Sequence, residues 1–466
     1  MTGKRVGVIA GRRPGSVQQM FRSIHVLSGE ILFERAPQPY ADFAQDLAEL
    51  RRRQSRFAAL PVTRRTALLL ELADKLAQKR DVLAKMVCEE VGRCLRECEA
   101  ELDKSVELIR YYAHLSPELL AHKTIATQAS LSQVRFEPLG VVLAVMPWNY
   151  PVWQVLRFAV PALCAGNACV VKPAPSVARV TEALFDLVHE DLPMMAAWLA
   201  ADDVRYAIEE CDALAFTGST ETGRLLAGHA GRSLKKSVLE LGGSNPFIVL
   251  ADADLAQAAK DACYSRFRDA GQSCNAAKRI IVEEAVADRF SELFLAECGR
   301  LQTGDPMRPE TTLAPLHRED LRDKVHAQVV DALANGARAL CGGKIPEGPG
   351  WFYPATVLAD VNPACRVYHE EVFGPVAVLM RAADAEAAVA LANDNPFGLG
   401  AAIYTANEQA GWRYAEKLQT GAVFINRHTS SDLRLPFGGV KASGYGRELS
   451  EFGLYEFVNV KSYWQK

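Results

Sequence analysis

The sequence lacks a long apolar run, a C-x-x-C pair and an excess of charge of either sign. No apolar run reaches the roughly eighteen residues of a membrane span, and the basic start at residues 3–15 has too short an apolar core for a secretory signal. The 53 basic and 56 acidic residues leave a net charge of −3, too small a field to attract nucleic acid. We therefore expect neither a membrane nor a nucleic acid as partner.

The chain also lacks a disulfide framework. Its 11 cysteines are odd in number and scattered, which fits reduced thiols in the cytoplasm. Hydrophobic residues make up 49% and charged residues 23% of the chain, as in an ordinary soluble enzyme. A length of 466 residues suggests about two to three domains. No repeat or Ser/Pro/Gly-rich linker separates them, so the boundary expected near residues 242–244 is soft.

Helical and strand patterns are distributed unevenly along the chain. Residues 41–60, 62–92 and 95–115 carry apolar residues at helical spacing, and Gly92 is a natural helix stop. Short apolar runs then alternate with helical stretches, which predicts parallel sheets covered by helices. The predicted strands are 140–146, 168–172, 213–216, 237–241, 246–250 and 278–282, and then 337–341, 376–380, 400–404 and 421–425.

Residues 124–136 and 454–464 alternate like strands outside this series. Exposed strand edges need partners. Either these segments form an arm that pairs between subunits, or each lies on its own sheet; the sequence favours neither interpretation.

Polar residues follow several predicted strands, at the edge where α/β sheets collect ligands. Asn149 lies between two prolines after the strand at 140–146, and its fixed amide suits a developing oxyanion, although such an Asn is often only a turn residue. Lys172 ends the apolar strand at 168–172, where it either binds a ligand or simply reaches solvent. The turn at Gly218 and Ser219 opens a helix and fits either a phosphate or an N-cap.

Two further residues suit covalent chemistry. Glu240 is a carboxylate inside an apolar strand end, where burial raises its pKa toward that of a general base. Cys274 lies in a glycine-containing loop, unlike the other cysteines, which mostly occupy apolar helix or strand patterns. Each signal is weak alone.

In their order along the chain and in their residues, these motifs together resemble those of the aldehyde dehydrogenase superfamily. Matching blocks also occur at 370–375 (EEVFGP), 395–399 (NPFGL) and 436–444 (PFGGVKASG), and the resemblance runs from Phe21 to the C-terminus. It implies a Rossmann-type coenzyme domain, an α/β catalytic domain and a small β oligomerisation arm. The implied boundaries are 21–120 with 138–242 for the coenzyme domain, 243–454 for the catalytic domain, and 121–137 with 455–466 for the arm, after a loose tail at 1–20.

The resemblance also implies roles for individual residues. Cys274 is the nucleophile, Asn149 and the Cys274 backbone N–H form the oxyanion hole, and Glu240 is the general base. Lys172 and Glu371 contact ribose hydroxyls of NAD or NADP, Ser219 contacts the pyrophosphate, and Phe373 packs near the nicotinamide. No metal is required, and no ligand cluster is spaced to hold one. The expected coenzyme-binding residues are Trp148, Lys172, Gly218, Ser219, Glu371 and Phe373.

The chain departs from the family pattern at three places. NAD-selective members carry a Glu where this chain has Pro175, so both coenzymes are expected, with NAD slightly favoured. The segment between Leu192 and Cys211, which walls the adenine in relatives, is shorter than usual and implies weaker coenzyme binding. The usual opening motif is replaced at residues 25–30, and residues 1–20 match nothing.

Arg157 and Arg268 are the residues that indicate the class of substrate. Arg157 is a charge in an apolar helix, and taken alone an internal ion pair is its first interpretation. Arg268 lies six residues before Cys274, and both positions match the arginines that bind the substrate carboxylate in succinate-semialdehyde dehydrogenases. The loop around Ser431 resembles the substrate loop of the bacterial Sad-type branch.

We therefore expect NAD(P)-dependent oxidation of a short carboxylated aldehyde by a cytoplasmic homodimer or homotetramer, through a cysteine thiohemiacetal and thioester. Succinate semialdehyde is the first candidate and glutarate semialdehyde the second. The alternatives are another aldehyde range, acyl transfer to coenzyme A, which would leave Glu240 without a role, and a non-catalytic structural or binding protein.

Overall fold

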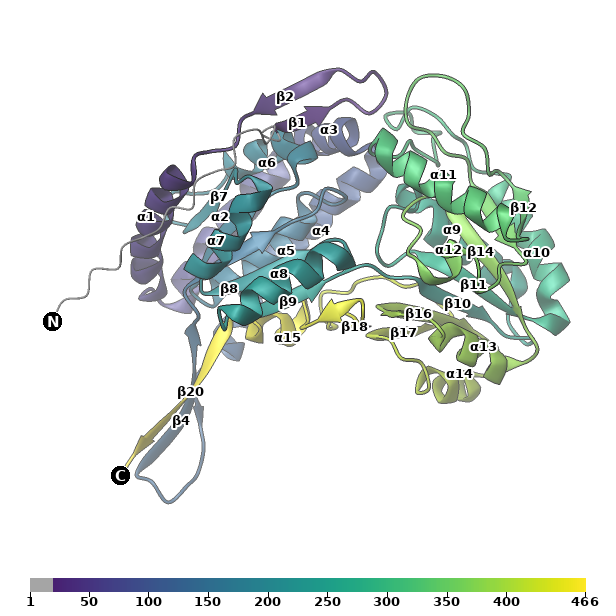
Figure 1. Cartoon of the computed structure of the whole chain (residues 1–466). Coiled ribbons are helices and arrows are strands. Elements are labelled where there is room, and N and C mark those ends of the chain that lie inside the picture. The colour runs from purple at the N-terminus through teal and green to yellow at the C-terminus, as the bar shows by residue number, and fades with distance from the viewer. Residues whose placement is uncertain (1–19) are drawn as a thin grey trace.

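The computed structural model describes residues 20–466, so the expected loose tail lies outside the described residues apart from Met20. Two lobes, each a mostly parallel sheet between helices, lie side by side, and a narrow β arm projects from the first (Figure 1). This arrangement confirms the α/β class predicted from the alternating patterns.

The first lobe is built on a six-stranded sheet. Its strands are parallel except for the edge pair β19–β9. Along β5, Val141 and Leu143 pack into one apolar cluster while Val142 and Ala144 pack into another, so both faces are buried. In order across the sheet the strands are β19 (Gly444–Tyr445), β9 (Lys236–Glu240), β8 (Ala213–Thr217), β5 (Val141–Val145), β6 (Ala168–Lys172) and β7 (Met194–Ala196).

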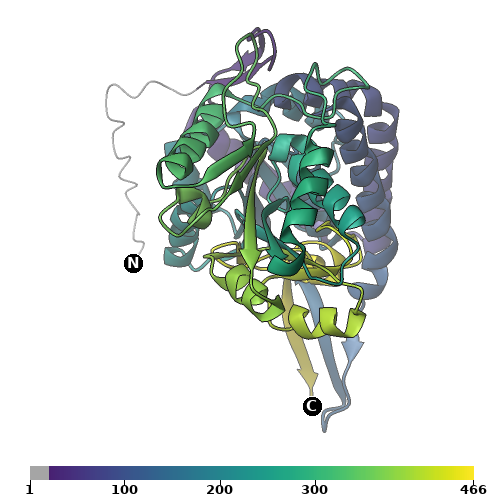
Figure 2. The same ribbon diagram turned by 90° about the vertical axis from the view of Figure 1, so that its right-hand side faces the viewer.

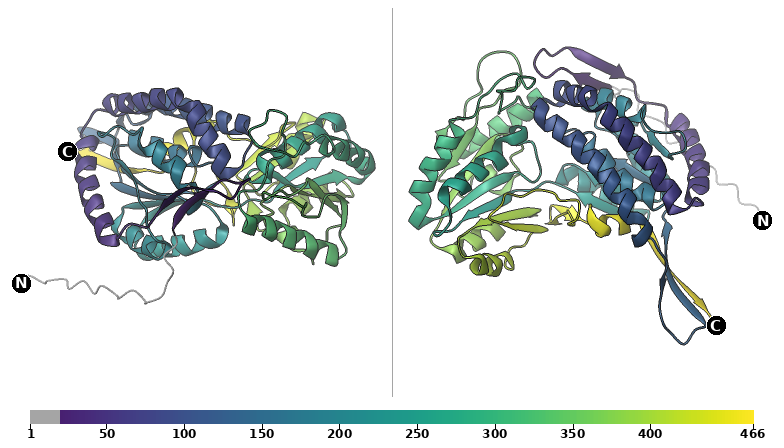
Figure 3. Two further views of the ribbon diagram at one scale, coloured as in Figure 1. Left: turned by 90° about the horizontal axis from the view of Figure 1, so that it is seen from above. Right: turned by 180° about the vertical axis from the view of Figure 1, so that it is seen from behind.

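Helices cover both faces of this sheet (Figure 3). One layer contains α1 (Tyr40–Ala58), α7 (Val204–Glu210) and α8 (Thr220–Arg232). The other contains α2 (Val62–Gln78), α3 (Arg80–Val91), α4 (Leu95–Leu119), α5 (Trp153–Cys164), α6 (Ala178–Phe185) and α15 (Ser450–Tyr455). The hairpin of β1 (Phe21–Ile24) and β2 (Ile31–Arg35) lies against α6.

The single helical stretch predicted at 62–92 is two helices. It breaks at Lys79, whose φ of −99° and ψ of 7° leave the helical region for one residue. Because both halves keep their apolar faces against the same core, periodicity alone does not show the break. Gly92 ends α3 with a φ of 88°, a left-handed conformation that glycine adopts without strain, as the sequence predicts.

The second lobe is built on a seven-stranded sheet (Figure 2). The strands are β12 (Arg338–Cys341), β13 (Thr356–Ala359), β14 (Val376–Ala382), β11 (Ala277–Glu283), β10 (Asn245–Val249), β16 (Gly400–Tyr404) and β17 (Ala422–Ile425). Its helices are α9 (Leu255–Phe267), α10 (Glu284–Cys298), α11 (Glu319–Ala334), α12 (Arg366–His369), α13 (Ala385–Asn393) and α14 (Glu408–Ala415), beside a small sheet of β15 (Phe397–Gly398) and β18 (Val440–Lys441).

Near its C-terminus the chain returns to the first lobe. Gly444 and Tyr445 of β19 pair with Glu240 and Leu239 of β9. These two residues of the segment expected as the catalytic domain, 243–454, therefore extend the edge of the first sheet, and the expected domain boundaries stay a prediction.

The two segments left open by the sequence pair with each other within one chain. In β20 (Val458–Gln465) and β4 (Leu131–Pro138), Val458 lies opposite Pro138 and Gln465 opposite Leu131, and β3 (Lys123–Thr124) adds a third strand. The arm projects away from both lobes (Figure 1). Its two outer strands, β20 and β3, keep free edges.

Candidate active site

Four motifs singled out in the sequence leave the same edge of the six-stranded sheet. Strands β5, β6, β8 and β9 run parallel, so their carboxyl ends lie together. The segments at these ends carry Asn149, Lys172, Gly218 and Glu240. This edge is where an open α/β sheet binds its ligand.

Cys274 lies in a loop between the 3₁₀ turn η3 (Arg268–Gly271) and β11. Asp269 and Ala270 have φ angles of 53° and 50°, a left-handed conformation that costs energy for residues with a Cβ. Gly271 follows at 72°, and a Cβ there would lie 2.4 Å from the carbonyl oxygen of Gly374. The segment before the nucleophile is thus held in a strained and crowded turn.

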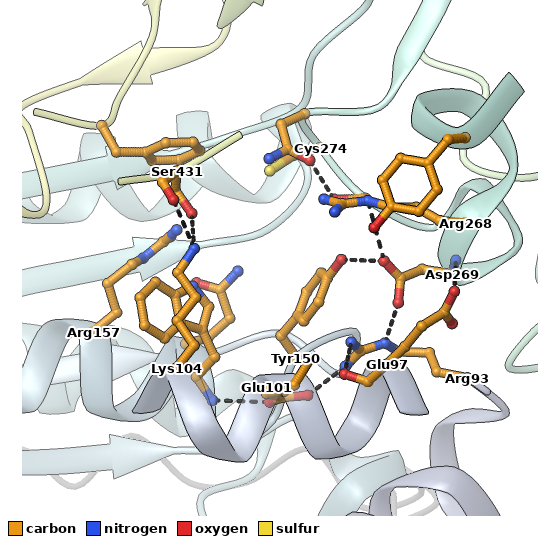
Figure 4. Close-up of a pocket in the computed structure, with 17 residues that line it drawn as sticks. Arg93, Glu97, Glu101, Lys104, Tyr150, Arg157, Arg268, Asp269, Cys274 and Ser431 are labelled. Carbon is orange, nitrogen blue, oxygen red and sulfur yellow. Dashed lines mark hydrogen bonds and ion pairs between the residues drawn. The ribbon is translucent and has the colours of Figure 1, made fainter. Parts of the chain in front are cut away.

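A buried charge network holds this turn (Figure 4). The Asp269 carboxylate accepts from Arg93 Nε and from the Tyr150 hydroxyl, each at 2.5 Å. Arg93 also pairs with Glu101, which accepts two backbone N–H groups at the start of α5, both at 2.9 Å. Despite its burial, the positive charge of Arg93 keeps the Asp269 pKa below its usual value. The network ties the nucleophile loop to the helix that carries Arg157.

Lys278 fixes the backbone of the nucleophile itself. Its ammonium donates to the carbonyl oxygens of Ser273 and Cys274, each at 3.0 Å, and pairs with Glu371 at 3.1 Å. The Cys274 carbonyl also accepts from Asn245 at 2.8 Å. One buried lysine therefore joins the nucleophile loop to a predicted coenzyme-binding residue.

Cys274 is partly exposed and lines a small pocket. Burial raises its pKa to about 11, while the charges of Arg157 and Lys278 oppose that rise. Without a ligand the sulfur therefore carries its proton at neutral pH, and a base must remove that proton before attack.

Asn149 is buried beside this loop. Its amide nitrogen donates to the Gln272 carbonyl at 3.1 Å, which leaves its second N–H uncommitted. No acceptor in the described part of the chain takes the backbone N–H of Cys274. These two N–H groups are the pair that the family resemblance implies for the oxyanion.

Glu240 ends β9, and only 3% of it is exposed. Both of its carboxylate oxygens lack a hydrogen-bond partner among residues 20–466. Burial, followed by the nearby Glu448 carboxylate, raises the Glu240 pKa well above its usual value. An unpartnered buried carboxyl with a raised pKa has the properties of a general base.

The predicted coenzyme residues include a buried lysine and a pair of packed rings. Lys172 is buried, the described residues offer it no carboxylate, and burial lowers its pKa to about 8. The rings of Trp148 and Phe373 meet edge to face at 5.8 Å. His317 stacks on Trp148 at 4.3 Å, and burial lowers the pKa of its imidazole to about 3. These residues thus provide a neutral aromatic wall and an ammonium without a carboxylate at contact.

The turn after β8 acts as the N-cap of α8, one of the two roles that the sequence allows for it. The Ser219 hydroxyl accepts from the Thr222 N–H at 3.3 Å, and the Gly218 N–H donates to the Glu240 carbonyl at 3.0 Å. The Gly218 N–H is thus unavailable to a phosphate. A Cβ on Gly218 would lie 2.5 Å from the Phe216 ring, so glycine is required for packing.

The three predicted substrate residues share one pocket with the nucleophile. Arg157, Arg268 and Ser431 line a cavity of about 160 Å³ that Cys274 also lines. Figure 4 shows Arg157 and Arg268 on opposite sides of it. A cavity of this volume suits a short aldehyde.

Arg157 has a partner inside the protein. It pairs with Glu448, and each of these side chains is only 3% exposed. The internal ion pair that the sequence allows is therefore present, because a guanidinium at this depth requires a counter-charge, and the contact of Arg157 with a substrate carboxylate stays a prediction. Arg268 lies 3.7 Å from Asp269, whose carboxylate is shared with Arg93 and Tyr150, and its side chain is 24% exposed.

Sequence reasoning missed Lys104, Lys278 and Arg93. Lys104 belongs to an ordinary helical pattern and Arg93 to the short turn between α3 and α4, and neither gave a signal. A charged pair, Lys278 and Arg279, opens an otherwise apolar strand, and this signal could have been noticed.

Comparisons with known proteins agree with this site. The model of the "Aldehyde dehydrogenase family" matches residues 15–463. The succinate semialdehyde dehydrogenase [NAD(P)+] Sad of Escherichia coli is 44% identical over 86% of this chain and 88% of its own. A succinate-semialdehyde dehydrogenase [NADP(+)] of Deinococcus radiodurans is 41% identical over 92% and 88%.

Solved structures agree as well. The succinic semialdehyde dehydrogenase of Streptococcus pyogenes, in complex with NADP+, superposes with a TM-score of 0.92 at 34% identity, covering 95% of this chain and 99% of that one. The match therefore spans both lobes as well as the loops that carry Cys274, Glu240 and Asn149. This chain belongs to the aldehyde dehydrogenase family.

Proposed function

We propose that the protein oxidises succinate semialdehyde to succinate with NADP or NAD as hydride acceptor. One observation carries this proposal: a nucleophilic cysteine shares a small pocket with cationic side chains. The relatives described above are named for the same substrate.

The site residues divide the chemistry among them. Once a base has taken its proton, the Cys274 sulfur adds to the aldehyde carbon, and the N–H groups of Asn149 and Cys274 stabilise the oxygen that becomes negative. A bound nicotinamide coenzyme would supply the acceptor for the hydride that leaves that carbon. Glu240 then deprotonates a water molecule, which cleaves the thioester and frees the acid and the thiol.

The chain's own residues fit a nicotinamide coenzyme. The unpaired Lys172 ammonium and the Glu371 carboxylate suit ribose hydroxyls, and the Trp148–Phe373 wall suits the nicotinamide ring. The shortened segment expected to weaken this site still supplies the edge strand β7 and the buried Trp198.

Coenzyme choice depends on Pro175, which opens the turn η1 (Pro175–Val177) after Lys172. An uncharged residue there does not repel a 2′-phosphate. The relatives' printed names include NADP(+) and NAD(P)+. We propose that both coenzymes are used.

Pro175→Glu should weaken NADP use. The new carboxylate would repel the 2′-phosphate, and a like-charge contact in partly exposed surroundings corresponds to about a tenfold loss in kcat/KM. Steady-state kinetics with each coenzyme measure the effect, and Pro175→Gln controls for loss of the ring. Unchanged NADP kinetics in Pro175→Glu would show that the ribose binds elsewhere.

Arg268→Ala should raise KM for succinate semialdehyde at least about tenfold, since one charge-assisted hydrogen bond is lost. KM for butanal, an uncharged aldehyde of the same chain length, should change little. Reduced-coenzyme absorbance measures both. If the wild-type enzyme oxidises butanal as efficiently as succinate semialdehyde, the proposed substrate is wrong.

We further propose a cytoplasmic homodimer or homotetramer. All 11 cysteines are free, as in a reducing compartment. The arm exposes Val460 and Trp464 on β20, each 59% exposed, beside a free strand edge. Pairing with another subunit would cover this edge. Within residues 20–466, no helix is long and apolar enough to cross a membrane.

A further inference from the structure

Lys104, on α4, differs from the other cations that line the pocket. Arg93 pairs with Glu101, Arg157 pairs with Glu448, and Arg268 lies near Asp269. Among the described residues, no carboxylate lies within ion-pair distance of the Lys104 ammonium. Of these four cations, Lys104 is thus the one that has no carboxylate in contact.

The surroundings of Lys104 leave room for an anion. Its Nζ donates to the Ser431 carbonyl at 2.8 Å and to the Ser431 hydroxyl oxygen at 2.5 Å, and it lies 4.6 Å from the centroid of the Trp153 ring (Figure 4). An ammonium has three N–H groups, so one remains uncommitted. Because the Ser431 oxygen accepts from Lys104, its own hydrogen is also free to donate. Two donors on adjacent residues match the two oxygens of a carboxylate.

Lys104 and Ser431 also lie in a part of the pocket that suits the substrate carboxylate. Both line the inner cavity with Cys274, and both line a wider hollow beside it that Cys274 does not reach. They therefore lie at the boundary between the inner cavity and that hollow. A short aldehyde bound with its carbonyl at the sulfur would lie in the same cavity as these two side chains.

We propose that Lys104 and the Ser431 hydroxyl together bind the substrate carboxylate and set the preference for carboxylated over uncharged aldehydes. This inference rests on the proposed function, and it assigns the main contact to a lysine that the sequence did not single out. Arg268 contributes from the opposite side, while Arg157 is already paired with Glu448.

The electrostatics of the pocket support this assignment. Burial, then the charges of Arg157 and Arg268, lower the Lys104 pKa to about 8, while Asp432 and Glu107 oppose the shift. An incoming carboxylate relieves the repulsion among these cations. Below that pKa Lys104 is charged and binds the anion; above it the charge and its attraction disappear.

The test compares Lys104→Met with Lys104→Arg. At pH 7, Lys104→Met should raise KM for succinate semialdehyde at least about tenfold, the lower range for a hydrogen bond to a charged group, and should change kcat/KM for butanal less than about twofold. Succinate should inhibit butanal oxidation correspondingly less. Lys104→Arg, which keeps the charge, should recover most of the affinity, and Lys260→Met, at an exposed position of α9, controls for net charge.

The pH profile provides a second readout. In the wild-type enzyme, the ratio of kcat/KM for succinate semialdehyde to that for butanal should fall as the pH rises through about 8, and this fall should vanish in Lys104→Arg. Groups that serve both substrates, such as Cys274 and Glu240, cancel in the ratio. A wild-type preference that Lys104→Met leaves intact would overturn this inference alone. A wild-type enzyme without the preference would overturn the proposed function itself.

Discussion

Replacing Cys274 by alanine should abolish the oxidation of every aldehyde. The covalent path requires a sulfur at this position, and the residues on either side, Ser273 and Asn275, supply none. The Ser273 hydroxyl is also committed, since it donates to the Asn275 side chain at 2.7 Å. We expect turnover to fall by about a thousandfold or more, as when an enzyme loses its nucleophile. The measurement is the rate of reduced-coenzyme formation.

Two observations keep this prediction interpretable. Cys341→Ala removes another partly exposed cysteine, on β12 of the second lobe, and should retain full activity. Coenzyme titration by fluorescence quenching should show that Cys274→Ala still binds NADP, so that lost activity cannot reflect misfolding. Retention of more than about a tenth of the wild-type turnover in Cys274→Ala would mean that the reaction is not covalent.

Glu240→Gln should separate the two halves of the reaction. An amide cannot deprotonate water, so the enzyme should release one equivalent of reduced coenzyme and then stall as the thioester. We expect steady-state turnover to fall by about 10²–10⁴-fold, the usual contribution of a general base. Stopped-flow absorbance measures the burst, and mass spectrometry of the quenched protein should find the acyl group on Cys274.

The burst also tests a competing assignment for Glu240. Burial raises the pKa of Cys274 to about 11, so the thiol too needs a base. If Glu240 were that base, Glu240→Gln would lose the burst together with the steady state. A burst that is absent, or smaller than the enzyme concentration, would therefore contradict the assignment of Glu240 to thioester hydrolysis.

The strands that carry the site were predictable because they are local patterns. The predicted strand at 168–172 coincides with β6. Lys172 and Glu240 end strands that the apolar runs identified, and Asn149 and Gly218 follow such strands. Parallel pairing then requires these ends to meet at one edge. The break at Lys79 and the return of β19 to β9 were not predictable, because both depend on packing between distant segments.

The sequence by itself determined the family and the α/β class, and it supplied Cys274, Glu240 and Asn149 as candidates for the chemistry, since each signal is contained in a short stretch of chain. Only the tertiary structure decided which cations of the pocket have a carboxylate partner and which do not. It paired Arg157 with Glu448, which lies far along the chain, and brought Lys104 of an ordinary helix against Ser431. The physical reason is that a buried charge takes its properties from whatever the fold places within a few ångströms, and sequence spacing does not contain that distance.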